Sequence, residues 1–177
     1  MSRAALALLL VLALARADEP QAPPPVTGVG TWFVAGEEPE APPAWAKDGA
    51  VDFEALRGKV VVLEFWMSWC PGCARTRPVL AKLHEQHPDD LLVLGITATD
   101  AKQSAEAARR YVAEHVPFPV ALLATGETIA RYEVGKIPHA VVVDRAGRVR
   151  WRGNPDREAK AFKAAVHAAL REPARED

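Results

Sequence analysis

The stretch Lys59-Val-Val-Val-Leu-Glu-Phe-Trp-Met-Ser-Trp-Cys-Pro-Gly-Cys73 decides the fold of this chain. Its first eight residues form a β-rich, mostly apolar run, which is typical of a strand buried on both faces of a sheet. The Cys-Pro-Gly-Cys motif follows at once. Beyond it, Val79, Leu80 and Leu83 recur at helical spacing until Pro88 ends the pattern. The sequence therefore predicts a buried strand that runs directly into a helix beginning at the cysteine pair.

Further strands and helices alternate along the rest of the chain. We expect strands at 91–97 and 119–123, and a hairpin of 140–144 and 149–151 around Arg145-Ala-Gly147. We expect one helix to be capped by Thr99 or Asp100 and to end near His115. A last helix begins at Asn154 and Pro155 and buries Phe162, Ala165, Val166 and Ala169. This alternation of strands and helices predicts an α/β fold with a mixed sheet covered by helices on both faces.

The first 17 residues have the pattern of a secretory signal peptide. Met1-Ser2-Arg3 is positively charged, Ala4–Ala15 is apolar, and Ala15-Arg16-Ala17 has the small-x-small pattern of a cleavage site. The apolar run is short for a membrane span. We expect cleavage after Ala17 and a soluble mature protein, with an uncleaved anchor as the alternative.

Length and charge limit what the remaining chain can be. A chain of 177 residues suits one domain with a sizeable core, and a formal net charge of −1 gives no indication of nucleic-acid binding. We expect a Pro-rich N-terminal extension at 18–45, a domain at 46–172 and a tail at 173–177. Trp32 and Phe33 interrupt the Pro-rich segment, so we expect part of it to pack on the domain.

Cys70 and Cys73 are the two cysteines of the chain. A disulfide between them closes a very small loop and constrains little of the unfolded chain, so a purely structural role explains the pair poorly. Disulfide exchange needs a thiolate nucleophile and a second thiol that resolves the mixed disulfide. A helix N-terminus at Cys70 favours the thiolate. We expect Cys70 to be the exposed attacking residue and Cys73 to be the more buried resolving residue.

Metal and haem sites are poorer explanations of the same motif. A zinc site usually needs four ligands, and there is no second cysteine pair. His84 and His87 fit the surface of the following helix better than a metal site. A c-type haem site needs a histidine after the second cysteine, where this chain has Ala74. We expect no metal site.

Several segments carry a resemblance to a known family. Glu64-Phe-Trp-Met-Ser-Trp-Cys-Pro-Gly-Cys73 strongly resembles the active-site strand and turn of thioredoxins. Five further segments are similar to the TlpA/ResA-like branch of that superfamily: Gly58-Lys-Val-Val-Val62, Phe118-Pro119, Tyr132-Glu-Val-Gly135, Ile137-Pro138 and Val143-Asp-Arg-Ala-Gly147. The resemblance covers about 45–170. It implies a thioredoxin-like fold and thiol:disulfide oxidoreductase activity, with no cofactor beyond a redox-active Cys70–Cys73 disulfide.

The resemblance also implies the roles of further residues. Pro138 matches the family's cis-proline, which lies against the cysteine pair and shapes the substrate groove. Glu64 matches the family's buried acid; burial would raise its pKa, so that it takes a proton from Cys73. The groove residues implied are Trp69, Pro71, Gly72, Ile137 and His139, whereas Trp66 fits the core.

Two positions depart from the family pattern. Thr76 stands where ResA-like proteins often have a second acid, which leaves Glu64 as the local carboxylate. His139 follows the expected cis-proline, where threonine is usual, and its imidazole can bond locally, stabilise a thiolate or join the cysteines as a metal ligand. A copper metallochaperone that uses Cys70, Cys73 and His139 is therefore the alternative function. A thiol peroxidase does not fit, because Leu63 and Met67 occupy positions that its motif needs.

The expected partners follow from export and from the resemblance. We expect exported protein disulfides as substrates, with cytochrome c or copper-site maturation as candidate roles, and an upstream membrane thiol reductase. We expect no nucleic-acid partner and a monomer located in the periplasm. The direction of electron flow does not follow from the sequence.

Overall fold

The computed structural model describes residues 21–34, 36–123 and 125–173. The expected signal peptide at 1–17 and the end of the expected tail lie outside these ranges. Within them, no helix has the length and apolar character that crossing a membrane requires.

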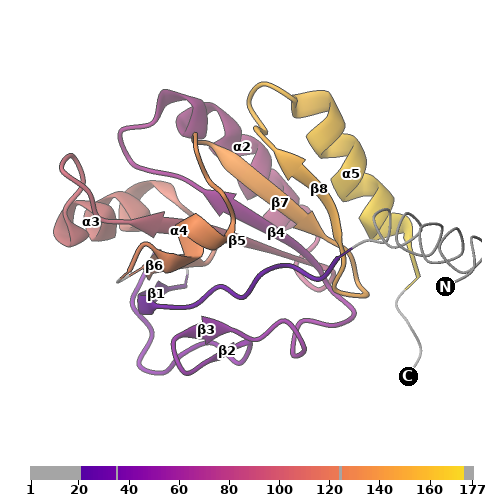
Figure 1. Cartoon of the computed structure of the whole chain (residues 1–177), viewed down its shortest axis with the longest axis horizontal. Coiled ribbons are helices and arrows are strands. Elements are labelled where there is room, and N and C mark those ends of the chain that lie inside the picture. Colours follow the sequence, from indigo (N-terminus) through magenta and orange to yellow (C-terminus); the bar gives the residue numbers. More distant parts are fainter. Residues whose placement is uncertain (1–20, 35, 124, 174–177) are drawn as a thin grey trace, which may run out of the picture.

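A mixed sheet forms the centre of the molecule, as predicted, and it has six strands, including one in the Pro-rich segment that was not predicted (Figure 1). The strand order is β1-β6-β5-β4-β7-β8, with β4 running parallel to β5 and antiparallel to β7. The strands are β1 (Val29–Phe33), β4 (Val60–Phe65), β5 (Leu91–Ala98), β6 (Val120–Leu123), β7 (His139–Val143) and β8 (Val149–Gly153). All residues of β4 and β5 are buried, which agrees with their continuous apolar sequences.

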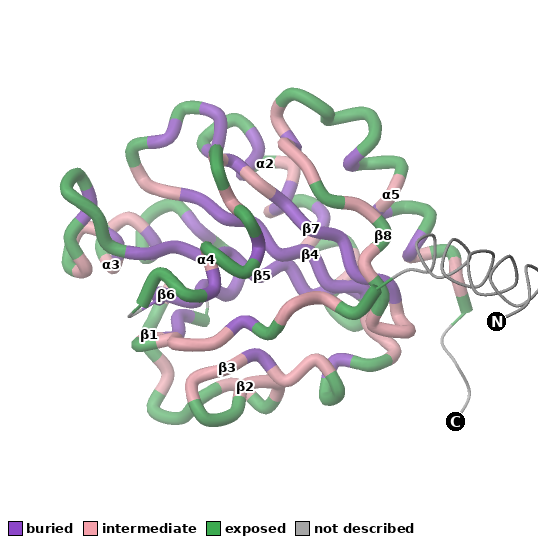
Figure 2. Tube along the Cα trace, viewed as in Figure 1, coloured by how far each residue is buried: buried purple, intermediate pink, exposed green. Residues whose placement is uncertain are grey.

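Two hydrophobic cores lie on opposite faces of this sheet, because successive side chains of a strand point to opposite sides. Val60 and Val62 face one core, and Val61 and Leu63 face the other. The first core is covered by α2 (Pro71–Gln86), α3 (Ala105–His115) and α5 (Ala159–Arg171). The short helix α4 (Glu127–Arg131) and the N-terminal segment cover the second. Figure 2 shows that the buried positions concentrate in the central strands.

The start of α3 differs from the prediction. The helix begins at Ala105 with Ser104 as its N-cap, whose side chain accepts a hydrogen bond from the Ala107 N–H. Asp100 instead caps a turn, since its Oδ1 accepts from the backbone N–H groups of Lys102 and Gln103. Both Asp and Ser favour such positions, so the residue type alone did not identify which one begins the helix.

The last helix also begins later than predicted. Oδ1 of Asn154 accepts hydrogen bonds from the N–H groups of Asp156 and Arg157, so it caps a turn, and α5 begins at Ala159. Phe162 is buried in this helix as expected, but Ala165 is only partly buried against the core.

The N-terminal segment is part of the sheet. β1 pairs antiparallel with β6 and forms one edge. Trp32 and Phe33 are buried in this strand, and Trp32 packs edge-on against Trp45 with ring centroids 5.3 Å apart. A small hairpin of β2 (Ala46–Lys47) and β3 (Ala50–Val51) follows. The domain boundary at residue 45 stays a prediction. The sheet includes β1, which precedes this residue, because Trp32 and Phe33 anchor the Pro-rich segment in the core.

The opposite edge of the sheet is β8, which pairs only with β7 in the described chain. Along β8, the exposed positions are Arg150 and Arg152, and they alternate with partly buried Val149 and Trp151. Trp151 packs against Phe162 of α5, with ring centroids 5.4 Å apart. One face of this edge strand is therefore apolar and the other carries two cations.

Candidate active site

Cys70 and Cys73 form a disulfide at the start of α2, with Cα atoms 5.3 Å apart. Cys70 is the N-cap of the helix, and its Sγ accepts a hydrogen bond of 3.1 Å from the Cys73 N–H. Pro71 follows as the first helical residue, where its missing N–H costs nothing. The helix N-terminus thus directs an N–H group and the positive end of its dipole at the Cys70 sulfur, which favours a thiolate there after reduction.

The exposure of the cysteines differs in part from the prediction. Cys70 is 5% exposed and Cys73 is 0% exposed. Cys73 is the more buried, as expected, but the expectation of an exposed Cys70 was wrong for the disulfide state. In that state its sulfur is bonded back towards Cys73, within the first turn of α2.

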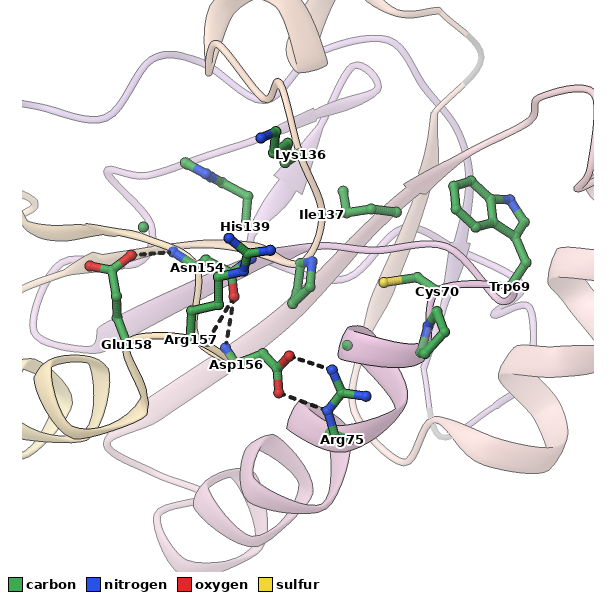
Figure 3. Close-up of a pocket in the computed structure, with 14 residues that line it drawn as sticks. Trp69, Cys70, Arg75, Lys136, Ile137, His139, Asn154, Asp156, Arg157 and Glu158 are labelled. Carbon is green, nitrogen blue, oxygen red and sulfur yellow. Dashed lines mark hydrogen bonds and ion pairs between the residues drawn. The ribbon is translucent and has the colours of Figure 1, made fainter.

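A cavity of about 600 Å³ opens beside the disulfide (Figure 3). Its lining includes the predicted groove residues: Trp69, Cys70, Pro71, Gly72, Ile137, Pro138 and His139. The remaining lining residues were not predicted: Arg75, Lys136, Gly153, Asn154, Asp156, Arg157 and Glu158. Most of these come from the β8–α5 connection, which the sequence does not place near the cysteines. The structure thus brings together residues from three distant parts of the chain.

Pro138 packs against the start of α2. The Ile137–Pro138 peptide bond is cis, as predicted. A Cβ atom added to Gly72 would lie only 2.8 Å from Cδ of Pro138. Glycine is therefore required at the second position of the helix because the proline ring occupies the space of any larger side chain.

Ion pairing connects α2 to the segment before α5. Arg75 donates hydrogen bonds to both carboxylate oxygens of Asp156, at 3.0 and 2.6 Å (Figure 3). The contact lowers the pKa of Asp156 through the hydrogen bond and the positive charge of Arg75. This pair connects two of the segments that line the cavity. Trp69, which also lines it, is 42% exposed.

Glu64 is 1% exposed and lies within the apolar sheet. Its neighbours in register are Gly95 on β5 and Ala140 on β7. Burial raises the pKa of its carboxyl group to about 7, against the lowering effects of a hydrogen bond from Thr76 and the charge of Arg77. The expected burial and raised pKa are thus present, and a carboxyl group with this pKa can exchange protons near neutral pH.

Arg77 is a buried cation next to this region. Its guanidinium lies over the rings of Trp66 and Tyr111, at 5.4 and 4.8 Å from their centroids, and Nη1 donates a hydrogen bond to the Tyr111 hydroxyl. Trp66 itself is in the core, as predicted. Cation–π contacts of this kind stabilise a cation without a carboxylate partner.

His139 lies at the start of β7 and lines the cavity. Burial lowers its pKa, and Arg152 lowers it further while Glu158 raises it. Its Nε2 is buried and has no hydrogen-bond partner among the described residues. Within the same ranges, no group of three or more His, Cys, Asp or Glu side chains is placed to hold a metal ion. The copper-binding alternative stays a prediction.

Gln103 supports the loop before Cys70 and is not among the predicted site residues. Its side chain is fully buried, and Oε1 accepts a hydrogen bond of 2.7 Å from the Ser68 N–H. Nε2 donates to Thr97 Oγ1 and to the Ala98 carbonyl oxygen. A glutamine in a polar connection between a strand and a helix has no sequence pattern that distinguishes it from a surface residue.

Comparisons with known proteins agree with this geometry. The chain is 30% identical over 100 residues to the thiol-disulfide oxidoreductase ResA of Bacillus cereus, an alignment that covers 56% of this chain and 57% of that protein. The chain therefore matches little more than half the length of this relative.

Solved structures show the fold. A putative thiol:disulfide interchange protein DsbE from Chlorobium tepidum superposes with a TM-score of 0.66 at 24% identity, covering 86% of this chain and 98% of that one. A secreted disulfide oxidoreductase of Mycobacterium tuberculosis homologous to E. coli DsbE gives 0.56 at 26% identity, covering 68% and 89%. The fold is thioredoxin-like, as predicted. Residues 39–169 match the Redoxin family model, and the chain belongs to the Redoxin family.

Proposed function

We propose that this protein is a thiol:disulfide oxidoreductase that exchanges disulfides with protein substrates. The observation that carries the proposal is the Cys70–Cys73 disulfide at the N-terminus of α2, open to a cavity that Pro138 lines. The names of the relatives, thiol-disulfide oxidoreductase and thiol:disulfide interchange protein, support it.

The first step uses Cys70 in the reduced protein. Its thiolate attacks one sulfur of a substrate disulfide, forming a bond between Cys70 and the substrate and releasing the other substrate sulfur as a thiolate. The helix N-terminus favours the thiolate form of Cys70 before attack. The cavity beside Cys70 gives the substrate chain a place to lie during this step.

The second step uses Cys73 and Glu64. Cys73 gives its thiol proton to Glu64 and attacks the Cys70 sulfur, which re-forms the Cys70–Cys73 bond and releases the second substrate thiolate. The two cysteines lose two electrons, and the substrate disulfide gains them. The reverse sequence of steps oxidises a substrate dithiol.

The proposed location is outside the cytoplasm, with the periplasm as the compartment. The signal-peptide pattern of residues 1–17 supports it, and the Mycobacterium tuberculosis relative is described as secreted. In this setting the substrates are exported proteins, including those of cytochrome c or copper-site maturation, and a membrane thiol reductase supplies electrons to a monomeric enzyme.

Reduction of insulin by dithiothreitol tests the activity. We expect the wild-type protein to accelerate insulin precipitation and Cys70→Ser to abolish the acceleration, because the attacking thiolate is lost. Cys73→Ala should accumulate a mixed disulfide through Cys70, and mass spectrometry of the trapped species from extract identifies the substrate. A Cys70→Ser variant that retains full activity contradicts the proposal.

A further inference from the structure

Thr76 lies one turn after Cys73 on α2, and its side chain is almost fully buried. Its Oγ1 is 2.8 Å from Oε1 of Glu64 and 3.0 Å from the carbonyl oxygen of Cys73. Both distances are within the range of hydrogen bonds between hydroxyl groups and oxygen acceptors. One hydroxyl group therefore contacts both the buried carboxyl group and the backbone of the resolving cysteine.

The single proton of this hydroxyl can serve only one of the two acceptors at a time. An ionised carboxylate can only accept a hydrogen bond, and it binds a donor more strongly than a neutral carbonyl does. A protonated Glu64 has a proton of its own, which it can donate to Oγ1 of Thr76. The hydroxyl proton is then free for the carbonyl oxygen of Cys73. The direction of these hydrogen bonds therefore depends on the protonation state of Glu64.

We propose that Thr76 is a positioning residue for the resolving step, which rests on the proposed role of Glu64 as the proton acceptor. Thr76 donates a hydrogen bond to Glu64 while the carboxylate is ionised. This bond stabilises the ionised form, which accepts the thiol proton. Once that proton has passed from Cys73 Sγ to Glu64, Thr76 donates to the carbonyl oxygen of Cys73 instead. Thr76 itself gains and loses no proton overall.

Few other groups near Glu64 can donate a hydrogen bond to its carboxylate. The facing residues on β5 and β7 are Gly95 and Ala140, and neither titrates. The buried residues of α5 are apolar. Among the described residues, the polar groups that act on the pKa of Glu64 come from α2: the Thr76 hydroxyl, through its hydrogen bond, and Arg77, through its charge. Thr76 and Arg77 are consecutive residues, so one turn of α2 supplies both effects that oppose the cost of burying the carboxylate.

Stopped-flow reaction of the reduced protein with 5,5′-dithiobis(2-nitrobenzoate) at pH 5.5–9 tests the proposal. The first thionitrobenzoate released reports attack by Cys70, and the second reports resolution by Cys73. We expect Thr76→Val to move the midpoint of the resolving phase upward by about one pH unit or more, because a hydrogen bond to the carboxylate is lost. Thr76→Ser should restore the wild-type midpoint. An unchanged midpoint in folded Thr76→Val overturns the proposal.

Two comparisons separate this inference from the proposed function. Thr128→Val removes another buried threonine hydroxyl, bonded to Thr27 on the other face of the sheet, and should leave the midpoint unchanged. Glu64→Gln should remove from the resolving phase the midpoint that Glu64 sets, leaving only the rise with pH that ionisation of the Cys73 thiol itself gives. If it does not, Glu64 is not the proton acceptor and the second step of the proposed function is wrong. If it does, and Thr76→Val has no effect, only the role of Thr76 is wrong.

An NMR titration of the oxidised protein tests the hydrogen-bond exchange without any reaction. We expect the carbonyl ¹³C resonance of Cys73 to shift with the same midpoint as the Glu64 carboxyl carbon, because the Thr76 proton moves between the two acceptors. Thr76→Val should abolish the coupled shift at Cys73, and Thr76→Ala serves if the valine variant does not fold. A Cys73 carbonyl that is insensitive to the titration of Glu64 in the wild type contradicts the exchange.

Discussion

The burial of the Glu64 carboxyl group makes the stability of the protein depend on pH. This group has a pKa of about 7 in the folded protein, above the ordinary value of 4.5, mainly because it is buried. The folded state therefore holds a proton that the unfolded state loses between pH 4.5 and 7. Stability consequently falls as the pH rises through this window and levels off above it.

Replacing Glu64 by Gln should remove this loss of stability. The shift from 4.5 to about 7 corresponds to about 3 kcal/mol. We expect urea unfolding of the oxidised wild-type protein to lose about this much more free energy between pH 4.5 and 8 than Glu64→Gln loses. His84 and His139 titrate in both proteins, so the difference isolates Glu64. Equal pH dependence in the two proteins would show that Glu64 is not desolvated.

A site residue could be predicted when neighbouring residues in the sequence reveal its role, and not when the role depends on a contact with a distant part of the chain. The cysteine pair and the acid in an apolar strand are visible in the sequence because each breaks a regular pattern. The cis bond before Pro138 came from family resemblance and is present in the structure. Gln103 and Asp156 could not be predicted, because their roles depend on contacts across 35 and 81 residues of chain.

Contacts between elements restrict which residues a position can hold. The clearest case is the contact between the start of α2 and the segment before β7. Gly72 and Pro138 belong to these two elements, and the space between them does not admit a Cβ atom. The proline ring is rigid, so the backbone of one element must move to relieve the contact.

Gly72→Ala should therefore displace Pro138 from the disulfide. We expect a loss of about 1–3 kcal/mol of stability from overpacking and slower attack by Cys70 in the dithiobis(nitrobenzoate) reaction. Gly126→Ala is the matched control, because a Cβ atom there has no neighbour within 4 Å and the residue has a negative φ of −81°. Similar effects of the two substitutions would show that the contact with Pro138 is not what requires glycine.

The elements themselves were predicted with unequal success. The buried strands and the hairpin were predicted closely because their apolar runs are continuous. The starts of α3 and α5 were misplaced, since Asp100 and Asn154 cap turns that precede the helices. The short helix α4 was not predicted, because five residues carry too little periodicity.

For the molecule as a whole, the N-terminal strand extends the sheet and contributes to both cores. Trp32 belongs to one core and Phe33 to the other. Trp32 and Phe33 indicated that part of the Pro-rich segment packs on the domain, and both are buried. The strand itself was not predicted, because its sheet partner β6 lies about 90 residues further along the chain.

Trp32→Ala tests how far the domain depends on this strand. We expect a loss of about 3–5 kcal/mol in urea unfolding, as for other buried tryptophans, with an unchanged rate of attack by Cys70 in the fraction that remains folded. Val34→Ala alters an exposed neighbour just beyond the strand and should change stability by less than about 0.5 kcal/mol. Comparable stability of Trp32→Ala and the wild type would mean that β1 is dispensable.

The two arginines on edge strand β8 have a consequence for the protein at high concentration. An exposed sheet edge can pair with the same edge of another copy, which begins aggregation. In an antiparallel pairing of two β8 strands, the arginines of one copy would lie near those of the other, and like charges across such a pair repel. Asp144 and Glu172 pair with Arg150, so the repulsion comes mainly from Arg152. Salt screens this repulsion. The colloidal behaviour of the protein should thus depend on ionic strength through one short strand on the far side of the sheet from β1.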